Sequence, residues 1–547
     1  MVFGQLHQTI RQAYRKSFGQ DPLAFEITAA PSPFIGDFST NLAMVSAAKD
    51  GGSAVALAQQ IVAALEQTGV FRSVSVSTPG FINFTITDQY LQGVVETIID
   101  KPEAFGRSDL GKEIRVLVEY ISANPTGPLT LANGRGAFIG ETIARVLELY
   151  GCKVVREFYL NDRGSQITAL GHSVLKDDQA EYRGPYIDQL ATRIKATDPV
   201  EVGEQAARTI FEEMIKPCIR EMGIEFHQFF SEKSLHQTGV FKKVMEMLEQ
   251  RGLTYMADGA KWLSTTRFGD DKDRVLVRSD GQDSYFASDI AYHAYKLQRG
   301  YHRLINVVGA DHYTYTKQLT MVVEGVLRGQ YTWGGKLDWV ITQLVKLVRD
   351  GQEIKMSKRT GSYVPLDELV AEVGPDAARF YYLHKSADSH LNFDLNLARS
   401  SSNQNPIFYV QYAYARVSSI LRQATKENGE ETIAPSRLMI RHPLERALLL
   451  KIIQFPDLVE EIAGDLQVHK LTHYVIGLAG DLHSFYEKLR VIGESPETSQ
   501  TRLTILKATS LTIKKALDLI GISAPSRMLR DQPTGQGQSK TPRAAKK

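Results

Sequence analysis

The chain of 547 residues has very little cysteine and no long apolar run. Its two cysteines, Cys152 and Cys218, are too few for a disulfide framework or a cysteine-based zinc site, so we expect no zinc. Apolar stretches such as 447–450 fall far short of the ~18 residues of a membrane-spanning helix. The first twenty residues contain no signal-peptide core. We therefore expect a cytoplasmic location and no membrane partner.

The overall composition is that of a globular protein of three or four domains, with 43% hydrophobic and 23% charged residues. The formal net charge is +2, but residues 391–547 carry 21 Lys and Arg against 15 Asp and Glu. A basic C-terminal third is compatible with a polyanionic partner. Charge alone fits a solvated surface with a chance asymmetry equally well.

The two ends of the chain differ in pattern from its middle. Residues 1–105 contain two helical patterns and two alternating strands around Pro79-Gly80, which predicts an N-terminal α+β domain. From Leu391 to about residue 530 helix follows helix without a convincing strand, which predicts an all-helical domain. Residues 531–547 are polar and basic, and we expect a disordered tail.

The middle of the chain, residues 106–390, alternates strands with helices. Strand, glycine-bearing loop, helix and strand in succession predict a doubly wound parallel nucleotide-binding sheet of the Rossmann type. Residues 165–280 hold helical segments and are expected to form an insertion between its halves. The elements expected are strands at 114–120, 152–160, 304–308 and 339–341 and a helix at 134–150.

A Gly/Pro-rich segment, 122–136, joins the first of these strands to the helix. Ligands bind parallel sheets at the carboxyl ends of strands, and a helix N-terminus offers free N–H groups to phosphate. Thr130 and Asn133 add a hydroxyl and an amide donor, and Gly134 and Gly136 let the backbone come close to a ligand. A connector that binds nothing explains the same residues.

A second candidate site is the basic loop that follows the turn at Asp350-Gly351. Lys355 and Lys358 lie three residues apart, beside Ser, Thr and Gly. Such a loop can close on a polyphosphate and neutralise the charge that develops there. A basic surface loop without a ligand is the alternative.

The two segments resemble the two signatures of class I aminoacyl-tRNA synthetases. Lys355-Met-Ser-Lys358 matches the second signature, and Ser122-Ala-Asn-Pro-Thr-Gly-Pro-Leu129 followed by Gly134-Arg-Gly136 is similar to the first one of bacterial-type arginyl-tRNA synthetases. A nucleotide-binding protein with a helical scaffold would explain the sheet but not this pair. Further stretches that resemble the family lie at 36–43, 159–166, 309–312, 405–416 and 524–528.

The resemblance implies that the chain is an arginine–tRNA ligase. Arginine would attack ATP to form arginyl-adenylate, and the 3′ adenosine of arginine tRNA would then accept the arginyl group. Magnesium would accompany the ATP, and activation in this family generally depends on bound tRNA. We expect a monomer.

The resemblance also implies an arginine site. A guanidinium needs planar acceptors, which carboxylates supply best. Tyr285 and Asp289, four residues apart and so on one helix face, are expected to bind the guanidinium, and Glu119 with Asn124 the α-amino end; Ser122 is assigned to arginine as well. Taken singly, Glu119 could be a paired strand-end carboxylate and Asp289 a surface charge.

The first signature departs from the family pattern of His-(Ile/Val/Leu)-Gly-His, because the same positions read Thr130-Leu131-Ala132-Asn133. Asn133 can replace one imidazole donor, Thr130 would reach a phosphate only through water, and Ala132 adds a methyl where adenine is expected to pack. Either the enzyme tolerates the change, with Lys355, Lys358 and the helix N-terminus carrying the phosphate charge, or the chain is a non-catalytic paralogue that binds tRNA or arginine. The lysine loop and the residues expected to bind arginine are intact, which favours an active enzyme.

The two outer domains are the expected tRNA-binding parts. The first ~105 residues would touch the outer corner of the tRNA, and the helical domain would read the anticodon loop. Tyr409, Tyr412 and Arg416 offer ring faces and a cation to splayed-out bases. The alternative is that Tyr409 and Tyr412 share a buried helix face.

Overall fold

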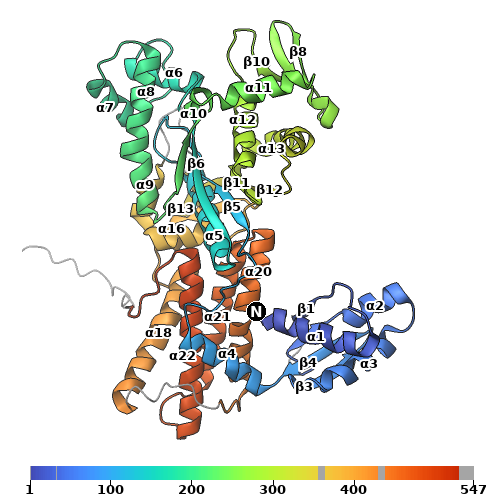
Figure 1. The fold of residues 1–547 in the computed structure, drawn as a ribbon. Helices are drawn as coiled ribbons and strands as arrows, with labels where there is room; N and C mark the ends of the chain where they lie inside the picture. The colour runs from blue at the N-terminus through green and yellow to red at the C-terminus, as the bar shows by residue number, and fades with distance from the viewer. Residues whose placement is uncertain (1, 32–33, 355–363, 429–437, 529–547) are drawn as a thin grey trace, which may run out of the picture.

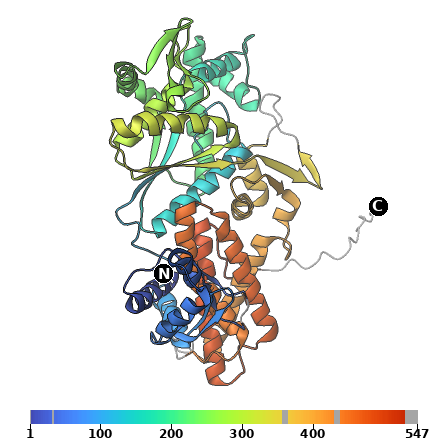
Figure 2. The ribbon, with the colours of Figure 1, turned by 90° about the vertical axis from the view of Figure 1, so that its right-hand side faces the viewer.

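The computed structural model describes residues 2–31, 34–354, 364–428 and 438–528 (Figure 1). A sheet-containing unit lies at one end, a bundle of long helices at the other, and a small α+β domain beside the bundle (Figures 1 and 2). Lys355, Lys358 and the tail 531–547 lie outside the described residues. In the part that is described, no helix has the length and apolar character needed to cross a bilayer.

The N-terminal domain is a four-stranded antiparallel sheet, in the order β1-β2-β4-β3, covered by helices. Leu6 and Ile10, at the helical spacing seen in the sequence, are fully buried. The predicted second helix and two strands are present. The elements are α1 (Val2–Phe18), β1 (Ile27–Ala29), β2 (Phe38–Thr40), α2 (Leu42–Asp50), α3 (Ala54–Glu66), β3 (Phe71–Ser77), β4 (Phe81–Ile86) and α4 (Asp88–Asp100).

The central sheet is parallel throughout, in the order β12-β11-β5-β6-β7. The chain starts at β5, runs outward through β6 and β7, and then returns to the other side through β11 and β12. This is the doubly wound topology expected, and its switch point lies between β5 and β11. The elements are β5 (Arg115–Glu119), α5 (Leu131–Leu149), β6 (Lys153–Leu160), β7 (Gln228–Ser231), α12 (Tyr285–Gln298), β11 (Arg303–Gly309), α13 (Tyr313–Val322) and β12 (Lys336–Thr342).

The expected insertion, residues 165–280, is only partly separate from the central sheet. It holds helices and a small antiparallel sheet in the order β10-β9-β8. Its strand β7, however, pairs with β6 as the edge strand of the central sheet. Four residues, Gln-Phe-Phe-Ser, are too few to reveal a strand by periodicity. The elements are α6 (Ser165–Leu175), α7 (Pro185–Arg193), α8 (Pro199–Ile210), α9 (Lys216–Glu221), α10 (Glu232–Gln237), α11 (Val240–Gln250), β8 (Thr254–Ala257), β9 (Ala260–Leu263) and β10 (Arg274–Val277).

The expectation of no strand after Leu391 is wrong for the first four residues. β15 (Leu391–Asp394) pairs in parallel with β13 (Val345–Arg349), because Leu391 and Phe393 bury on one face while Asn392 stays exposed. Helices follow. The remaining elements are β14 (Gln352–Ile354), α15 (Leu366–Val373), α16 (Pro375–Leu383), α17 (Leu395–Arg399), α18 (Pro406–Asn428), α19 (Pro443–Ile453), α20 (Phe455–Asp465), α21 (His469–Lys488) and α22 (Pro496–Ile520).

The N-terminal domain is joined to the helical bundle by a partly buried arginine on α19. The Arg446 guanidinium bonds both carboxylate oxygens of Asp37, at 2.9 and 2.6 Å, and Oδ1 of Asp88 at 2.8 Å. A two-pronged pair of this kind fixes orientation as well as distance. It therefore links the two outer domains without passing through the central sheet.

Candidate active site

The first signature lies at the carboxyl edge of the central sheet, beside the switch point. β5 ends at Glu119, and the chain turns sharply through Ile121 and Ser122, whose φ angles are +68° and +42°. It then enters α5, with Thr130 as the N-cap residue. A ligand between β5 and β11 would meet this turn and the N-terminus of α5.

The altered positions of the signature form a hydrogen-bonded cap on α5. Oδ1 of Asn133 accepts from the backbone N–H of Thr130 at 2.9 Å and from its hydroxyl at 2.8 Å. Thr130 and Asn133 are partly buried, and Ala132 between them is exposed. The Thr130 hydroxyl is thus committed to its neighbour three residues on.

The described chain that follows the second signature contacts the first signature. Thr130 forms an antiparallel bridge with Pro365, and the N–H of Leu366 donates to the carbonyl of Leu129 at 2.9 Å. A Cβ on Gly134 would lie 2.6 Å from Cδ1 of Leu366, so this glycine makes room for the start of α15. At Gly136 the nearest atom to an added Cβ would be Val307 Cγ1, at 3.8 Å. The residues that directly follow the lysine segment, 364–366, therefore lie against the first signature.

Three carboxylates gather at the same edge of the sheet: Glu119 at the end of β5, Asp289 on α12 and Glu232 at the start of α10. The pKa of Asp289 is raised to about 7, chiefly by burial and also by the charges of Glu119 and Glu232. The Tyr315 hydroxyl, which donates to Oδ2, and the charge of Lys296 act in the opposite direction. Burial also raises the pKa of Glu232, which is 4% exposed. Carboxylates that repel one another in this way are poised to take up a cation.

One side of Glu119 is already occupied. The ammonium of Lys296, which is fully buried on α12, contacts Oε2 of Glu119 and donates to Oδ1 of Asn306 at 2.7 Å. The Ser122 hydroxyl donates to Oε1 of Glu119 at 2.9 Å. Glu119 and Ser122 therefore belong to one network, as the alternative of a paired strand-end carboxylate anticipated. Within the described part of the chain, Asp289 and Glu232 form no direct ion pair, although the charges of Lys296 and Arg163 act on them.

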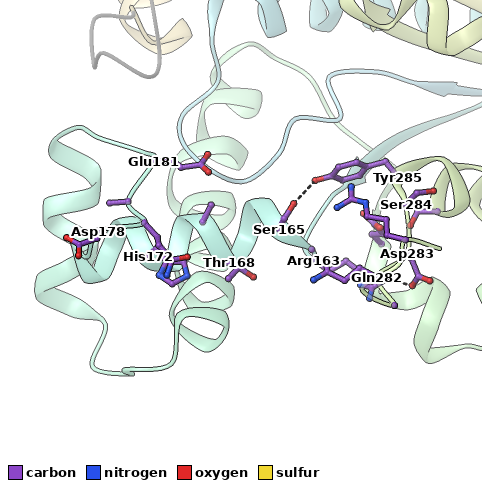
Figure 3. A pocket seen from close by; sticks show the side chains of 18 residues that line it. Arg163, Ser165, Thr168, His172, Asp178, Glu181, Gln282, Asp283, Ser284 and Tyr285 are labelled. Carbon is purple, nitrogen blue, oxygen red and sulfur yellow. Dashed lines mark hydrogen bonds and ion pairs between the residues drawn. The ribbon is translucent and has the colours of Figure 1, made fainter. Parts of the chain in front are cut away.

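A cavity of about 840 Å³, lined by Glu232 of this cluster, opens at the starts of α6, α10 and α12 (Figure 3). Glu232, Ser288 and Tyr285 are part of its wall. Tyr285, 40% exposed, reaches toward Ser165 on the opposite side, with 3.4 Å between the two hydroxyl oxygens (Figure 3). The charged residues of the wall are Arg163, Arg278, Asp178, Glu181, Glu232 and Asp283.

The residues predicted to bind the substrate arginine thus fall into two groups. Glu119 and Ser122 bond each other, and the charge of Glu119 acts on Asp289. Asn124 donates to Oε1 of Gln166 at 2.6 Å, and Tyr285 lies at the cavity. Across the described part of the chain, no three His, Cys, Asp or Glu side chains are arranged to hold a metal ion.

Two residues of the cluster, Glu232 and Lys296, were not found from the sequence. Lys296 follows Asp289 by seven residues, about two helical turns, so the two residues lie on the same face of the helix. The spacing argument that singled out Asp289 could therefore also have found Lys296. Glu232 follows β7 directly, in the position that carboxyl-end ligands occupy. It was hidden because β7 was not recognised as a strand.

The predicted tRNA-binding residues pack between α18 and α21. The rings of Tyr409 and Tyr412 lie 4.4 and 6.3 Å from that of His483, and the guanidinium of Arg416 lies 5.0 Å from the ring centre of Tyr486. Both tyrosines are partly buried, whereas Arg416 is exposed. The ring faces therefore serve helix packing, at least in part, as the alternative interpretation held.

Models of three protein domains match most of the chain. Residues 4–86 match the arginyl tRNA synthetase N terminal domain, residues 95–195 and 205–386 the catalytic domain of class I (R) tRNA synthetases, and residues 410–528 the DALR anticodon binding domain. The chain belongs to the arginyl-tRNA synthetase family. Its catalytic-domain match includes the signature turn, the three carboxylates and the cavity.

Curated members of the family from bacteria are similar over almost the whole chain. An arginine–tRNA ligase of Desulfosudis oleivorans is 41% identical over 90% of this chain and 93% of its own, and one of Moorella thermoacetica is 40% identical over 95% and 96%. Among solved structures, a putative arginyl-tRNA synthetase of Campylobacter jejuni has 29% identity and a TM-score of 0.73 over 81% of this chain and 100% of its own. The arginyl-tRNA synthetase of Thermus thermophilus, at 21% identity and a TM-score of 0.78 over 96% and 100%, shares the fold.

Proposed function

We propose that this chain is an arginine–tRNA ligase, which activates arginine with ATP and transfers it to the 3′ end of arginine tRNA. The observation that carries the proposal is the cluster of Glu119, Glu232 and Asp289 beside a cavity at the carboxyl edge of a doubly wound sheet. Buried carboxylates at a nucleotide-binding edge suit a substrate that is itself a cation. The family to which the chain belongs supplies the reaction.

The arginine site has a guanidinium end and an α-amino end. Asp289 and Glu232 bind the guanidinium, because the ammonium of Lys296 contacts Glu119 and pairs directly with neither of them, and Tyr285 closes over it. Asn124 and the Ser122–Glu119 pair bind the α-amino end. The arginine carboxylate would then lie toward α5 and the nucleotide.

Adenylate formation asks the protein for positioning and charge stabilisation. The arginine carboxylate attacks the α-phosphorus of ATP, the bond to the bridging oxygen breaks, and pyrophosphate leaves. The N-terminus of α5 and Asn133 receive phosphate oxygens. Lys355 and Lys358 neutralise the leaving pyrophosphate; this role rests on their match to the second signature. Magnesium enters bound to ATP, as part of the substrate.

The outer domains provide the tRNA contacts. We place the domain divisions near residues 105 and 390 and assign the anticodon loop to α18 and its neighbours. The exposed cation Arg416 is the group best placed there, with Tyr409 and Tyr412 supporting it from the packed side. Arg416→Gln should weaken tRNA binding a few-fold and lower the slope of log affinity against log salt by about one. An unchanged slope would contradict the assignment.

We propose a monomeric protein in the cytoplasm.

The proposal is tested by arginine-dependent ATP–pyrophosphate exchange with total tRNA present. Lysine, glutamate and cysteine serve as control amino acids. Exchange with arginine alone is expected. Intact tRNA binding without exchange would instead identify a non-catalytic paralogue.

A further inference from the structure

We propose that Thr130 is a positioning residue, which holds the side-chain amide of Asn133 so that its Nδ2 donates to a phosphate oxygen of ATP during adenylate formation. The inference rests on the proposed function. It assigns different tasks to the two altered positions of the signature. Asn133 touches the substrate, and Thr130 acts through Asn133.

The orientation of the amide follows from its partners. The backbone N–H of Thr130, 2.9 Å from the side chain of Asn133, can only donate, so the atom that faces it is the oxygen Oδ1. The Thr130 hydroxyl, 2.8 Å away, donates to the same oxygen. Because the amide group is planar, two donors on Oδ1 also fix Nδ2. Among the protein atoms that the structure describes, Nδ2 has no acceptor, so both its N–H groups remain for a ligand.

The cap that orients the amide is itself held in place. Thr130 is bridged to Pro365, and Leu366 bonds the preceding carbonyl and packs against Gly134. The first turn of α5 therefore cannot rotate freely with respect to the sheet. An asparagine that was free to rotate would lose side-chain entropy on binding a phosphate. A donor that is already held in place binds the phosphate with little further loss of entropy.

The competing explanation is a capping box that only starts the helix. Asn133→Asp keeps the acceptor for Thr130 and replaces both N–H donors by an oxygen, and a carboxylate in the first turn of a helix also favours the helix dipole. Full activity of this variant would leave only the capping role. Because its added charge also repels phosphate, a loss of rate supports the donor role only together with the Thr130 substitutions, which change no charge.

Thr130 is tested by a pair of substitutions. Thr130→Val keeps the shape and removes the hydroxyl, and Thr130→Ser keeps the hydroxyl. The control is Thr87→Val, since Thr87 caps α4 in the N-terminal domain with its hydroxyl accepting from the N–H of Tyr90 at 3.3 Å. Both valine variants lose about as much stability as a missing cap costs, but only Thr130→Val lowers the rate.

The experiment measures kcat and KM for ATP in arginine-dependent pyrophosphate exchange by the full chain with tRNA, together with thermal melting. We expect Asn133→Asp to lower kcat about 10²–10³-fold, the usual effect of losing one transition-state donor. We expect Thr130→Val to lower kcat about tenfold with KM for ATP nearly unchanged, and Thr130→Ser to restore most of it.

Full activity of Asn133→Asp would overturn the proposal, and so would a Thr130→Ser variant as slow as Thr130→Val. An exchange-inactive wild-type chain would overturn the proposed function itself. That result is distinct, because it is seen before any substitution is made.

Discussion

The two halves of the site, at one edge of one sheet, are built in different ways. The guanidinium side consists of two carboxylates from two helices, buried Glu232 on α10 and partly buried Asp289 on α12. Asp289 is tied to the core by the Tyr315 hydroxyl and by the charge of Lys296. The phosphate side is a single turn of helix, where Asn133 and Thr130 bond each other and remain partly exposed. A cation can be recognised only by charges whose desolvation has been offset in advance. A phosphate can be met by backbone N–H groups that any helix start supplies.

Removal of one carboxylate from the guanidinium side should have the largest effect. Asp289→Asn and Glu232→Gln keep shape and remove charge, and each removes one of the two carboxylates that bind the guanidinium. We expect kcat/KM for arginine to fall about 10³-fold, in line with the 3–5 kcal/mol cost of breaking a buried pair. Pyrophosphate exchange at varied arginine measures this.

The matched control is Asp273→Asn. Asp273 accepts the Tyr255 hydroxyl at 2.9 Å, as Asp289 accepts that of Tyr315, but it directly precedes β10 of the small antiparallel sheet. Its substitution should leave kcat/KM within about twofold. A loss below tenfold for both Asp289→Asn and Glu232→Gln would mean that the two halves are not built differently.

The second difference concerns stability. Lys296 lies fully buried with its ammonium between Glu119 and Asn306, so Lys296→Met leaves a carboxylate without its partner. We expect the free energy of unfolding to fall by about 3 kcal/mol, against about 1 kcal/mol for Thr130→Val. Denaturant unfolding measures both.

Lys261→Met is the control for the lysine, because Lys261 pairs with Glu249 at 3.3 Å near the surface. Its cost should stay below about 1 kcal/mol. Equal losses for Lys296→Met and Lys261→Met would show that the guanidinium side is not anchored in the core.

The sequence predicted the half of the site that depends on local order, and less of the half that depends on tertiary pairing. The strand–turn–helix around Thr130 and Asn133 follows from short-range signals, and so does the spacing of Tyr285 and Asp289. Glu232 was missed because β7 is too short to show a strand by its own periodicity and is defined by pairing with β6. The four residues of β15 were missed for the same reason.

Side-chain partners were the least predictable part. A glycine in a signature suggested room for nucleotide at Gly134, yet the atom that a Cβ would meet is Cδ1 of Leu366. Thr130 was expected to reach phosphate through water, but its hydroxyl is used within the chain. Neither partner lies within the pattern that a helix or strand repeat can reveal, because each depends on the loop geometry between elements.

The smallest expected effect is a pH dependence confined to the guanidinium side. Asp289 has a pKa of about 7, raised by burial, and a bound guanidinium stabilises its charged form. Arginine therefore binds the deprotonated protein, and KM for arginine should rise about tenfold as the pH falls from 8 to 6. KM for ATP, at saturating magnesium, should change less, since the amide of Asn133 does not titrate. Tyr315→Phe removes the hydroxyl that lowers this pKa and should move the midpoint to higher pH, whereas Tyr255→Phe should not. If Tyr315→Phe leaves the midpoint of the pH dependence of KM for arginine unchanged, the titration belongs to another group. The charge of Asp289 would then not limit arginine binding.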